Sequence, residues 1–175
     1  MLRFRCTLLL VALPLLAQRA VPVENEFVRV VSVVDKHVDK PGSVHEHQQN
    51  RVMIYLDTGE INIRYAKPDA IHKDEDQHWK AGDVAWSAAG GMHTSQHVSA
   101  APTRIVEIEL RKNTGKNAGP APKDGILENG QVRVYRGSTA PAAGLDFIAV
   151  DLRSAETLWN RLPAGTGPFI ITLLK

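Results

Sequence analysis

The feature that most constrains the fold of this chain is a series of short β-branched segments separated by turn residues. Such segments occupy residues 27–34 (FVRVVSVV), 51–56 (RVMIYL), 61–65 (INIRY) and 104–110 (RIVEIEL). Turn signals separate them, including Lys40-Pro41-Gly42, Asp57-Thr58-Gly59, Ala81-Gly82-Asp83 and Gly90-Gly91. Short strands with frequent turns are typical of antiparallel sandwiches and barrels, so we expect an all-β fold. A helical turn or two is expected only around residues 154–160.

The N-terminal 20 residues have the layout of a secretory signal peptide. Arg3 and Arg5 precede ten uninterrupted apolar residues, 7–16 (TLLLVALPLL), and small residues follow at Ala17 and Ala20. The apolar segment is shorter than the roughly 20 residues that span a bilayer, so we expect export without a stable membrane anchor. The predicted location is secreted or periplasmic, with cleavage after Ala17 or Ala20.

Charge and cysteine content exclude several classes of protein. The whole chain carries a formal charge of +2. Removal of residues 1–20 takes three arginines with it and leaves 18 basic against 19 acidic side chains. Because a nucleic-acid binder would show a basic patch or stripe, we expect no nucleic-acid partner. The single cysteine, Cys6, lies within the predicted signal peptide, so the mature protein has neither a disulfide nor thiol chemistry.

An imperfect internal repeat divides the remaining chain. Glu24-Asn25-x-x-Val28-Arg29-Val30 recurs 104 residues later as Glu128-Asn129-x-x-Val132-Arg133-Val134. A segment rich in Gly, Pro, Lys and Asn separates the two copies and is typical of a linker. We therefore expect a complete unit over residues 21–112, a linker over 113–125, and a truncated second repeat over 126–175. This second repeat is too short to close a barrel, so it packs on the first unit, adds strands to it, or binds a partner chain.

The histidines carry the functional signal. All seven lie between His37 and His97, within the first unit. His45 and His47 are two residues apart in a segment that leads into a strand, and strand side chains alternate between faces. Both imidazoles therefore project from one face and form half of a transition-metal site.

Two motifs in this region resemble those of the cupin family. Gly82, the turn position Ala88, Gly90, His93 and His97 have the spacing of the second cupin motif. Pro41-Gly42-x-x-His45-x-His47, with Gly59 downstream, resembles the first. The motifs cover residues 42–97, and the strand pattern extends the resemblance from 23 to 112.

The resemblance implies a small antiparallel jelly-roll β-barrel, with a divalent metal held inside by His45, His47 and His93. This sequence departs from the family pattern, because the acidic ligand expected after His47 falls on Arg51 or Val52. Alanine replaces the usual proline at Ala88, and histidine replaces the usual asparagine at His97. Three imidazoles without a carboxylate suit Zn, Fe(II), Ni or Cu better than harder ions.

Three further residues are candidates for the cavity. Gln49 shares the strand parity of His45 and His47 and could supply a neutral fourth ligand. Arg51 shares that parity as well, and beside a cation it would need an anion, such as a carboxylate on the ligand. Alternatively, residues 48–50 form a turn that resets the parity and leaves Arg51 in solvent. His97 is either a hydrogen-bonding partner or proton carrier near the metal, or a simple rim residue.

Other polar residues are expected to lie outside the site. His37, His72 and His78 are predicted to be solvated. Residues 65–77 are charged and are predicted to form an exposed loop. Glu107 and Glu109 are predicted to point outward, because Val106, Ile108 and Leu110 form the apolar face of their strand.

These observations leave three classes of function. The first is a secreted, metal-dependent cupin enzyme, an oxidoreductase, dioxygenase or isomerase, acting on a small organic molecule, which an inward Arg51 would require to be acidic. The second is a non-catalytic cupin that binds a small ligand with or without metal. The third is a structural protein whose barrel serves oligomerisation. A homodimer is expected for this family, whereas reaction type is not encoded in the fold.

Overall fold

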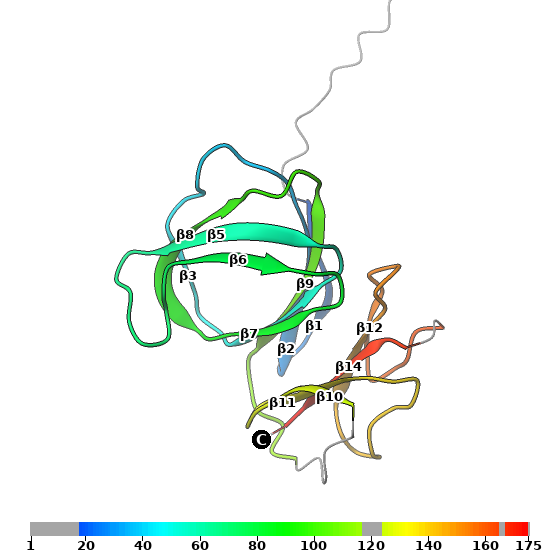
Figure 1. Ribbon diagram of the computed structural model, residues 1–175. Coiled ribbons are helices and arrows are strands. Elements are labelled where there is room, and N and C mark those ends of the chain that lie inside the picture. Colours follow the sequence, from blue (N-terminus) through cyan, green and yellow to red (C-terminus); the bar gives the residue numbers. More distant parts are fainter. Residues whose placement is uncertain (1–17, 117–123, 165–166, 175) are drawn as a thin grey trace, which may run out of the picture.

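The computed structural model describes residues 18–116, 124–164 and 167–174. Strands and connecting loops make up all of this described part, and they form three antiparallel sheets (Figure 1). The all-β antiparallel prediction is therefore confirmed. The helical turns expected over residues 154–160 are wrong, because this region contains the short strand β13 (Thr157–Trp159). Tight turns before and after it place Ala155 and Asn160 at positive φ.

The first sheet has the order β1-β2-β9-β4-β7. Its strands contain the β-branched residues that the sequence marked, and its central pair, β2 and β9, is aligned over eight residues. The strands are β1 (Gln18–Glu24), β2 (Val28–Asp35), β4 (Arg51–Tyr55), β7 (Val84–Ser87) and β9 (Thr103–Leu110).

The second sheet has the order β3-β8-β5-β6 and faces the first, so that the two enclose a β-barrel of jelly-roll type (Figure 1). The region 65–77, predicted as a loop, is a loop only over residues 66–74, because β5 ends at Tyr65 and β6 begins at Glu75. The strands are β3 (His45–His47), β5 (Gly59–Tyr65), β6 (Glu75–Trp79) and β8 (Gly90–His97).

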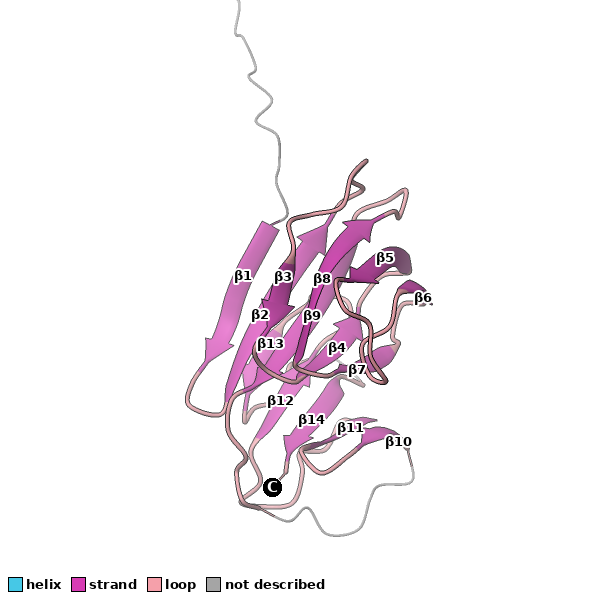
Figure 2. Ribbon diagram, turned by 90° about the vertical axis from the view of Figure 1, so that its left-hand side faces the viewer, coloured by secondary structure: helices cyan, strands magenta, loops and turns pink. Residues whose placement is uncertain are grey.

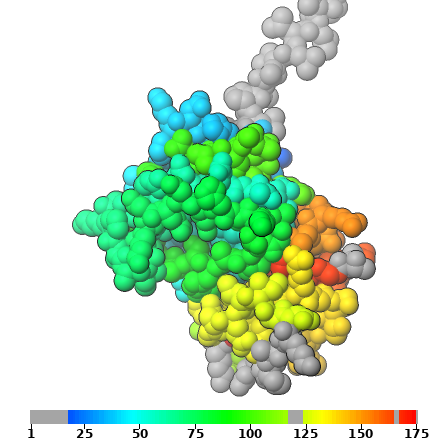
Figure 3. Space-filling view, in the orientation of Figure 1, coloured from blue at the N-terminus to red at the C-terminus, as the bar shows by residue number. Residues whose placement is uncertain are grey.

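The C-terminal region forms a third sheet, of order β10-β11-β14-β12-β13. It adds no strands to the barrel and instead packs against the outer face of the first sheet (Figures 2 and 3). The strands are β10 (Gly125–Glu128), β11 (Val132–Arg136), β12 (Phe147–Val150), β13 (Thr157–Trp159) and β14 (Phe169–Leu173).

The main hydrophobic core lies between the first and third sheets, outside the barrel. The first sheet contributes Val28, Val30, Val52, Ile54, Leu56, Val106, Ile108 and Leu110, and the third contributes Val132, Val134, Ile148, Val150, Phe169, Ile171 and Leu173. Since strand side chains alternate, the opposite face of the first sheet is left to line the barrel interior.

This arrangement corrects the prediction for β9. Val106, Ile108 and Leu110 do form an apolar face, but that face packs on the third sheet. Glu107 therefore points into the barrel, where only 7% of it is exposed. Glu109, on the same face, forms an ion pair with Arg29 at 3.1 Å. The apolar face of β9 was correctly predicted to be buried in a core. That core lies between the first and third sheets and not inside the barrel.

The two copies of the sequence repeat form matching β-hairpin turns. Asn25 Oδ1 accepts hydrogen bonds from the backbone N–H groups of Phe27 and Val28. Asn129 Oδ1 accepts the equivalent bonds from Gln131 and Val132. In each hairpin the glutamate before the asparagine pairs across the strands with an arginine. The repeat therefore encodes the same Asx turn at the start of both units.

Part of the predicted signal peptide and linker lies outside the described residues, namely residues 1–17 and 117–123. Gln18, Arg19 and Ala20, the last residues of the predicted signal, belong to β1 and pair with β2. Within the described ranges, no helix is long and apolar enough to cross a membrane.

Candidate metal centre

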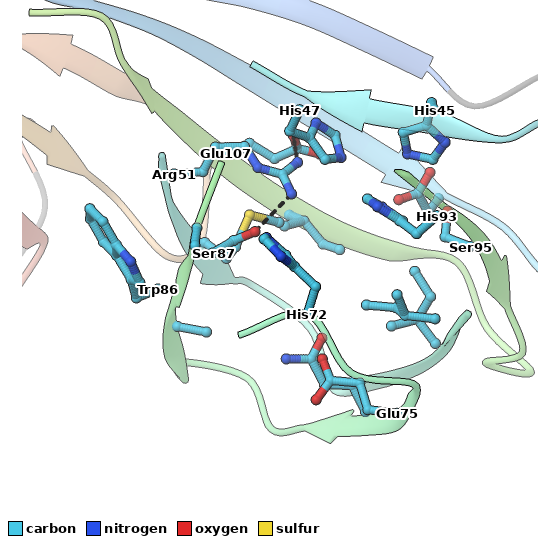
Figure 4. Close-up of a pocket in the computed structure, with 18 of the residues that line it drawn as sticks. His45, His47, Arg51, His72, Glu75, Trp86, Ser87, His93, Ser95 and Glu107 are labelled. Carbon is cyan, nitrogen blue, oxygen red and sulfur yellow. Dashed lines mark hydrogen bonds and ion pairs between the residues drawn. The ribbon is translucent and has the colours of Figure 1, made fainter. Parts of the chain in front are cut away.

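Three histidines converge inside the barrel. His45 and His47 lie on β3 and His93 lies on β8, where the antiparallel register pairs His45 directly with His93. One nitrogen of each ring lies within 4.8 Å of those of the other two. Ring centroids are separated by 4.5 to 5.3 Å, and the side chains point toward one another (Figure 4). The structure therefore brings together the three residues that the motifs predicted.

Backbone contacts fix the tautomers of two of these rings. His45 Nδ1 lies 3.0 Å from the Ser43 carbonyl oxygen, and His93 Nδ1 lies 2.7 Å from the Gly91 carbonyl oxygen. A carbonyl oxygen only accepts hydrogen bonds, so each Nδ1 carries the proton and donates it. Nε2 of each ring is then left with a lone pair, the form in which histidine binds metals.

The local electrostatics favour neutral imidazoles. Burial lowers the pKa of His47 most, and with the positive charge of Arg51 and the neighbouring histidines it brings that pKa to about 3. Burial also lowers the pKa of His93. Because a protonated histidine cannot ligate a metal, these shifts keep the rings competent at neutral pH. The donor set thus fits a transition-metal ion.

A cavity of about 570 Å³ adjoins the three histidines. Its wall combines the polar rings with side chains from both barrel sheets. The apolar and aromatic members include Met53, Tyr55, Ile61, Ile63, Tyr65, Trp79 and Ile105. A cavity of this size and mixed lining accommodates a small organic molecule.

Arg51 faces the cavity, but its charge is already paired. Its Nη1 donates to Glu107 Oε2 at 3.1 Å, and its Nη2 donates to Ser87 Oγ at 2.9 Å (Figure 4). Arg19 also lies 3.5 Å from Glu107. The anion that we expected a ligand to supply to Arg51 is therefore the protein's own carboxylate. Glu107 was missed because it lies on a different strand, 56 residues further along the chain.

Gln49 lies outside the cavity wall. It sits in the bend between β3 and β4 and is not among the cavity-lining residues. The turn expected at residues 48–50 is present, yet it turns Arg51 inward rather than into solvent. The alternation of side chains that places His45 and His47 on one face therefore does not extend to Gln49.

His72 was predicted to be solvated and is instead packed at the cavity wall. Only 12% of its side chain is exposed, and its ring contacts Asp69 Oδ2 and the Ala89 carbonyl oxygen, both at 3.1 Å. The ring also lies 5.3 Å from that of Tyr65. Gly91 permits this close approach, since a Cβ there would stand 2.6 Å from His72 and Tyr65. The charged composition of the loop concealed this inward residue.

The other histidines fall into two groups. His97 lines the cavity, and its Nε2 lies 2.8 Å from Asp35 Oδ2. It lies four residues beyond His93 on β8, too far along the strand to contact the metal centre. The side chains of His37 and His78 are 50% and 70% exposed, as the sequence predicted.

Similar barrels occur among solved structures. A cupin domain from Bordetella pertussis Tohama I is 20% identical and covers 55% of this chain and 94% of its own, with a TM-score of 0.47. An uncharacterised conserved protein with a double-stranded β-helix domain from Klebsiella pneumoniae is 22% identical, with coverages of 57% and 80% and a TM-score of 0.41. An RmlC-like cupin family protein from Methanocaldococcus jannaschii is 13% identical, with coverages of 54% and 80% and a TM-score of 0.43.

No protein-family model matches the sequence, and no curated protein matches it. The resemblance to cupins that the two motifs predicted is confirmed at the level of the fold, by the two facing antiparallel sheets and by the placement of both motifs around one cavity. The fold and the site together define a jelly-roll barrel with three histidines close enough to hold one ion.

Proposed function

We propose that this protein binds a divalent transition metal through His45, His47 and His93 and a small organic molecule in the adjoining cavity. The observation that carries the proposal is the convergence of three imidazole nitrogens within 4.8 Å. Two of the rings are held by backbone carbonyls in the metal-binding tautomer. Zinc, Fe(II), nickel and copper all suit an all-imidazole donor set.

A bound ion would act as a Lewis acid that polarises an oxygen of the small molecule. The chain's own residues then determine what can bind. Tyr65 packs 5.0 Å from the His93 ring and restricts access from one side. The Arg51–Glu107 pair lines the cavity wall without presenting a free charge, so the molecule need not be acidic.

Binding without turnover is a second candidate function. It is favoured by the engagement of Glu107, the buried carboxylate of the cavity, with Arg51 and Arg19. Each oxygen of this carboxylate is engaged by an arginine, so Glu107 is poorly placed to contact a proton on a bound molecule.

Metal content tests the proposal directly. Untagged protein is purified and its metals are measured beside a His45/His47/His93 triple alanine variant. The expected result is near-stoichiometric metal in the native protein and loss in the variant. Alanine at the exposed residues His37 and His78 is the matched control and should leave the content unchanged. Equal metal in the native protein and the triple variant would overturn the proposal.

Turnover separates the two candidate functions. The metal-loaded protein is screened for oxygen consumption and product formation with small phenols, thiols and keto acids. Turnover that is lost in the triple variant supports an enzyme. Saturable binding without turnover across the panel supports a binding protein.

We also propose that the protein is exported and forms a homodimer. Pairing of Gln18, Arg19 and Ala20 with β2 supports cleavage after Ala17, because cleavage after Ala20 would remove paired strand residues. The N-terminal sequence of the exported product identifies the cleavage site, and light scattering on the purified protein gives its mass. An uncleaved product or a monomeric mass would contradict these proposals.

A further inference from the structure

A second polar cluster lies in the same cavity, away from the candidate metal centre. His93 and His97 both face the cavity from β8, four residues apart, which places their Cα atoms about 13 Å from each other. The register confirms the separation, since His93 pairs with Tyr65 whereas His97 pairs with Ile61. His97 is therefore too far along the strand to hydrogen-bond to a metal ligand.

The partner of His97 is Asp35, at the end of β2. His97 Nε2 lies 2.8 Å from Asp35 Oδ2, and the two side chains are 11% and 22% exposed. The ring packs edge-on against Trp79, with centroids 6.2 Å apart, which fixes its orientation. Among the described residues, the second oxygen of the carboxylate, Asp35 Oδ1, accepts no hydrogen bond. Asp35 lines the cavity, so its Oδ1 is available to accept a hydrogen bond from a bound ligand.

A donor lies at the same level of the barrel. Ile61 pairs with His97 on one side and with Gln77 on the other, so all three occupy one row across the sheet. Gln77 Oε1 accepts a hydrogen bond from Tyr55 Oη at 3.3 Å, which directs the amide. Its Nε2 has no partner within the described part of the chain. This row therefore offers both an acceptor and a donor to a ligand.

The wall between the two polar regions is mixed. In the row between those of His93 and His97, Ile63 pairs with Ser95 on one side and with Glu75 on the other, and all three line the cavity. A molecule that contacts both regions would therefore need a polar group at each end.

We propose that the Asp35–His97 pair forms a second binding subsite, which holds a hydroxyl group at one end of a small molecule whose other end lies at the His45–His47–His93 centre. The hydroxyl donates to Asp35 Oδ1, and His97 positions the carboxylate. The ligand class is thus an elongated molecule with a metal-binding head and a distal hydroxyl. This inference rests on the proposed metal centre.

The test uses zinc-loaded full-length mature protein and synthetic hydroxamates, whose head group binds zinc. Two series of increasing alkyl chain length are compared, one ending in a hydroxyl and the other in its methyl ether. Affinities are measured by titration calorimetry. A methyl ether cannot donate, so at the matching chain length the hydroxyl should bind about tenfold more tightly. Equal affinities at every length would overturn the subsite.

The variant Asp35→Asn tests whether the preference for a hydroxyl depends on the carboxylate, because asparagine has nearly the same shape as aspartate. Its amide can still accept from His97, but it presents an N–H group to the ligand in place of an acceptor. The preference for hydroxyl over ether should fall from about tenfold to about one or reverse. Asp39→Asn, which removes a carboxylate that is 96% exposed, is the matched control and should keep the native preference. An unchanged preference in Asp35→Asn would also overturn the subsite.

A short hydroxamate without a tail distinguishes failure of the proposed subsite from failure of the proposed metal centre. If it binds native protein and Asp35→Asn equally well, the metal centre is intact, and any lack of hydroxyl preference refutes the subsite alone. If it fails to bind even the native protein, the proposed metal centre itself is contradicted. The comparison of hydroxyl and ether on native protein stands even if the variant does not fold.

Discussion

The barrel and the C-terminal sheet begin with the same Asx-turn hairpin but differ in what they enclose. The barrel contains a cavity lined by histidines, two arginines, carboxylates and aromatic rings. The C-terminal sheet has no histidine, and four consecutive residues of β12 and all five of β14 are buried. The larger buried core of the first unit is the one that it shares with the second, outside the barrel, and only a small cluster of Tyr55, Trp79 and Ile105 lies on the cavity side. A truncated repeat can thus free the barrel interior for binding.

The largest expected effect comes from breaking that shared core. Ile171 on β14 is fully buried in it, so Ile171→Ala should lower the free energy of unfolding by about 2–5 kcal/mol. Ile63→Ala, in the cavity wall, should cost about 1 kcal/mol, because its side chain already borders open space. Chemical denaturation measures both. Equal losses would contradict the view that the core outside the barrel dominates stability.

Metal binding should stabilise the barrel without any change in the core. At a free zinc concentration of 100 times Kd, the native protein should gain about 2.7 kcal/mol. The His45/His47/His93 triple alanine variant should gain nothing. Thermal unfolding with and without zinc measures the difference, and a gain that persists in the triple variant would place the binding elsewhere.

Alkaline pH should expose the burial of Tyr55 in the barrel. Burial, with a contribution from Glu75, raises its pKa to about 12 from an ordinary value of 10.0. The folded protein then keeps a proton that the unfolded chain loses, so stability falls as pH rises through this interval, by about 2 kcal/mol at pH 12. Tyr55→Phe should remove this part of the pH dependence. An identical alkaline profile for variant and native protein would contradict the assignment.

The smallest expected effect comes from the Asx-turn hairpin that begins both regions. Asn25→Ala and Asn129→Ala each remove a side-chain acceptor from two backbone N–H groups at a hairpin turn. Each should cost about 1 kcal/mol, and the two losses should be similar. Denaturation midpoints give the comparison. A neutral result in one hairpin alone would show that the turns are not equivalent.

Local patterns predicted four strands of the barrel, β2, β4, β5 and β9, and the three metal-site histidines. Alternation placed His45 and His47 on one face, and motif spacing added His93, because both signals are short-range. Long-range partners were not accessible in this way. Glu107 reaches Arg51, and Asp35 reaches His97, only through strand pairing between distant segments.

The wrong predictions share a physical cause. The outward placement of Glu107 assumed that the barrel interior was the apolar side of the sheet, whereas the third sheet covers the other side. His72 lies in a charged loop, and only its contacts with Asp69, Ala89 and Tyr65 turn it inward. Composition reports the average environment of a segment and not the direction of one side chain.

Side chains alternate along β4 and β9, so each strand has one set facing the cavity and another facing the hydrophobic core. Met53, Tyr55, Ile105 and Glu107 face the cavity, whereas Val52, Ile54, Val106 and Ile108 belong to the core. Every second position can therefore change with the molecule to be bound while its neighbours keep the protein folded. Such a wall lets ligand preference diverge with little loss of stability, whereas the insertion of one residue would exchange the two sets and lose both.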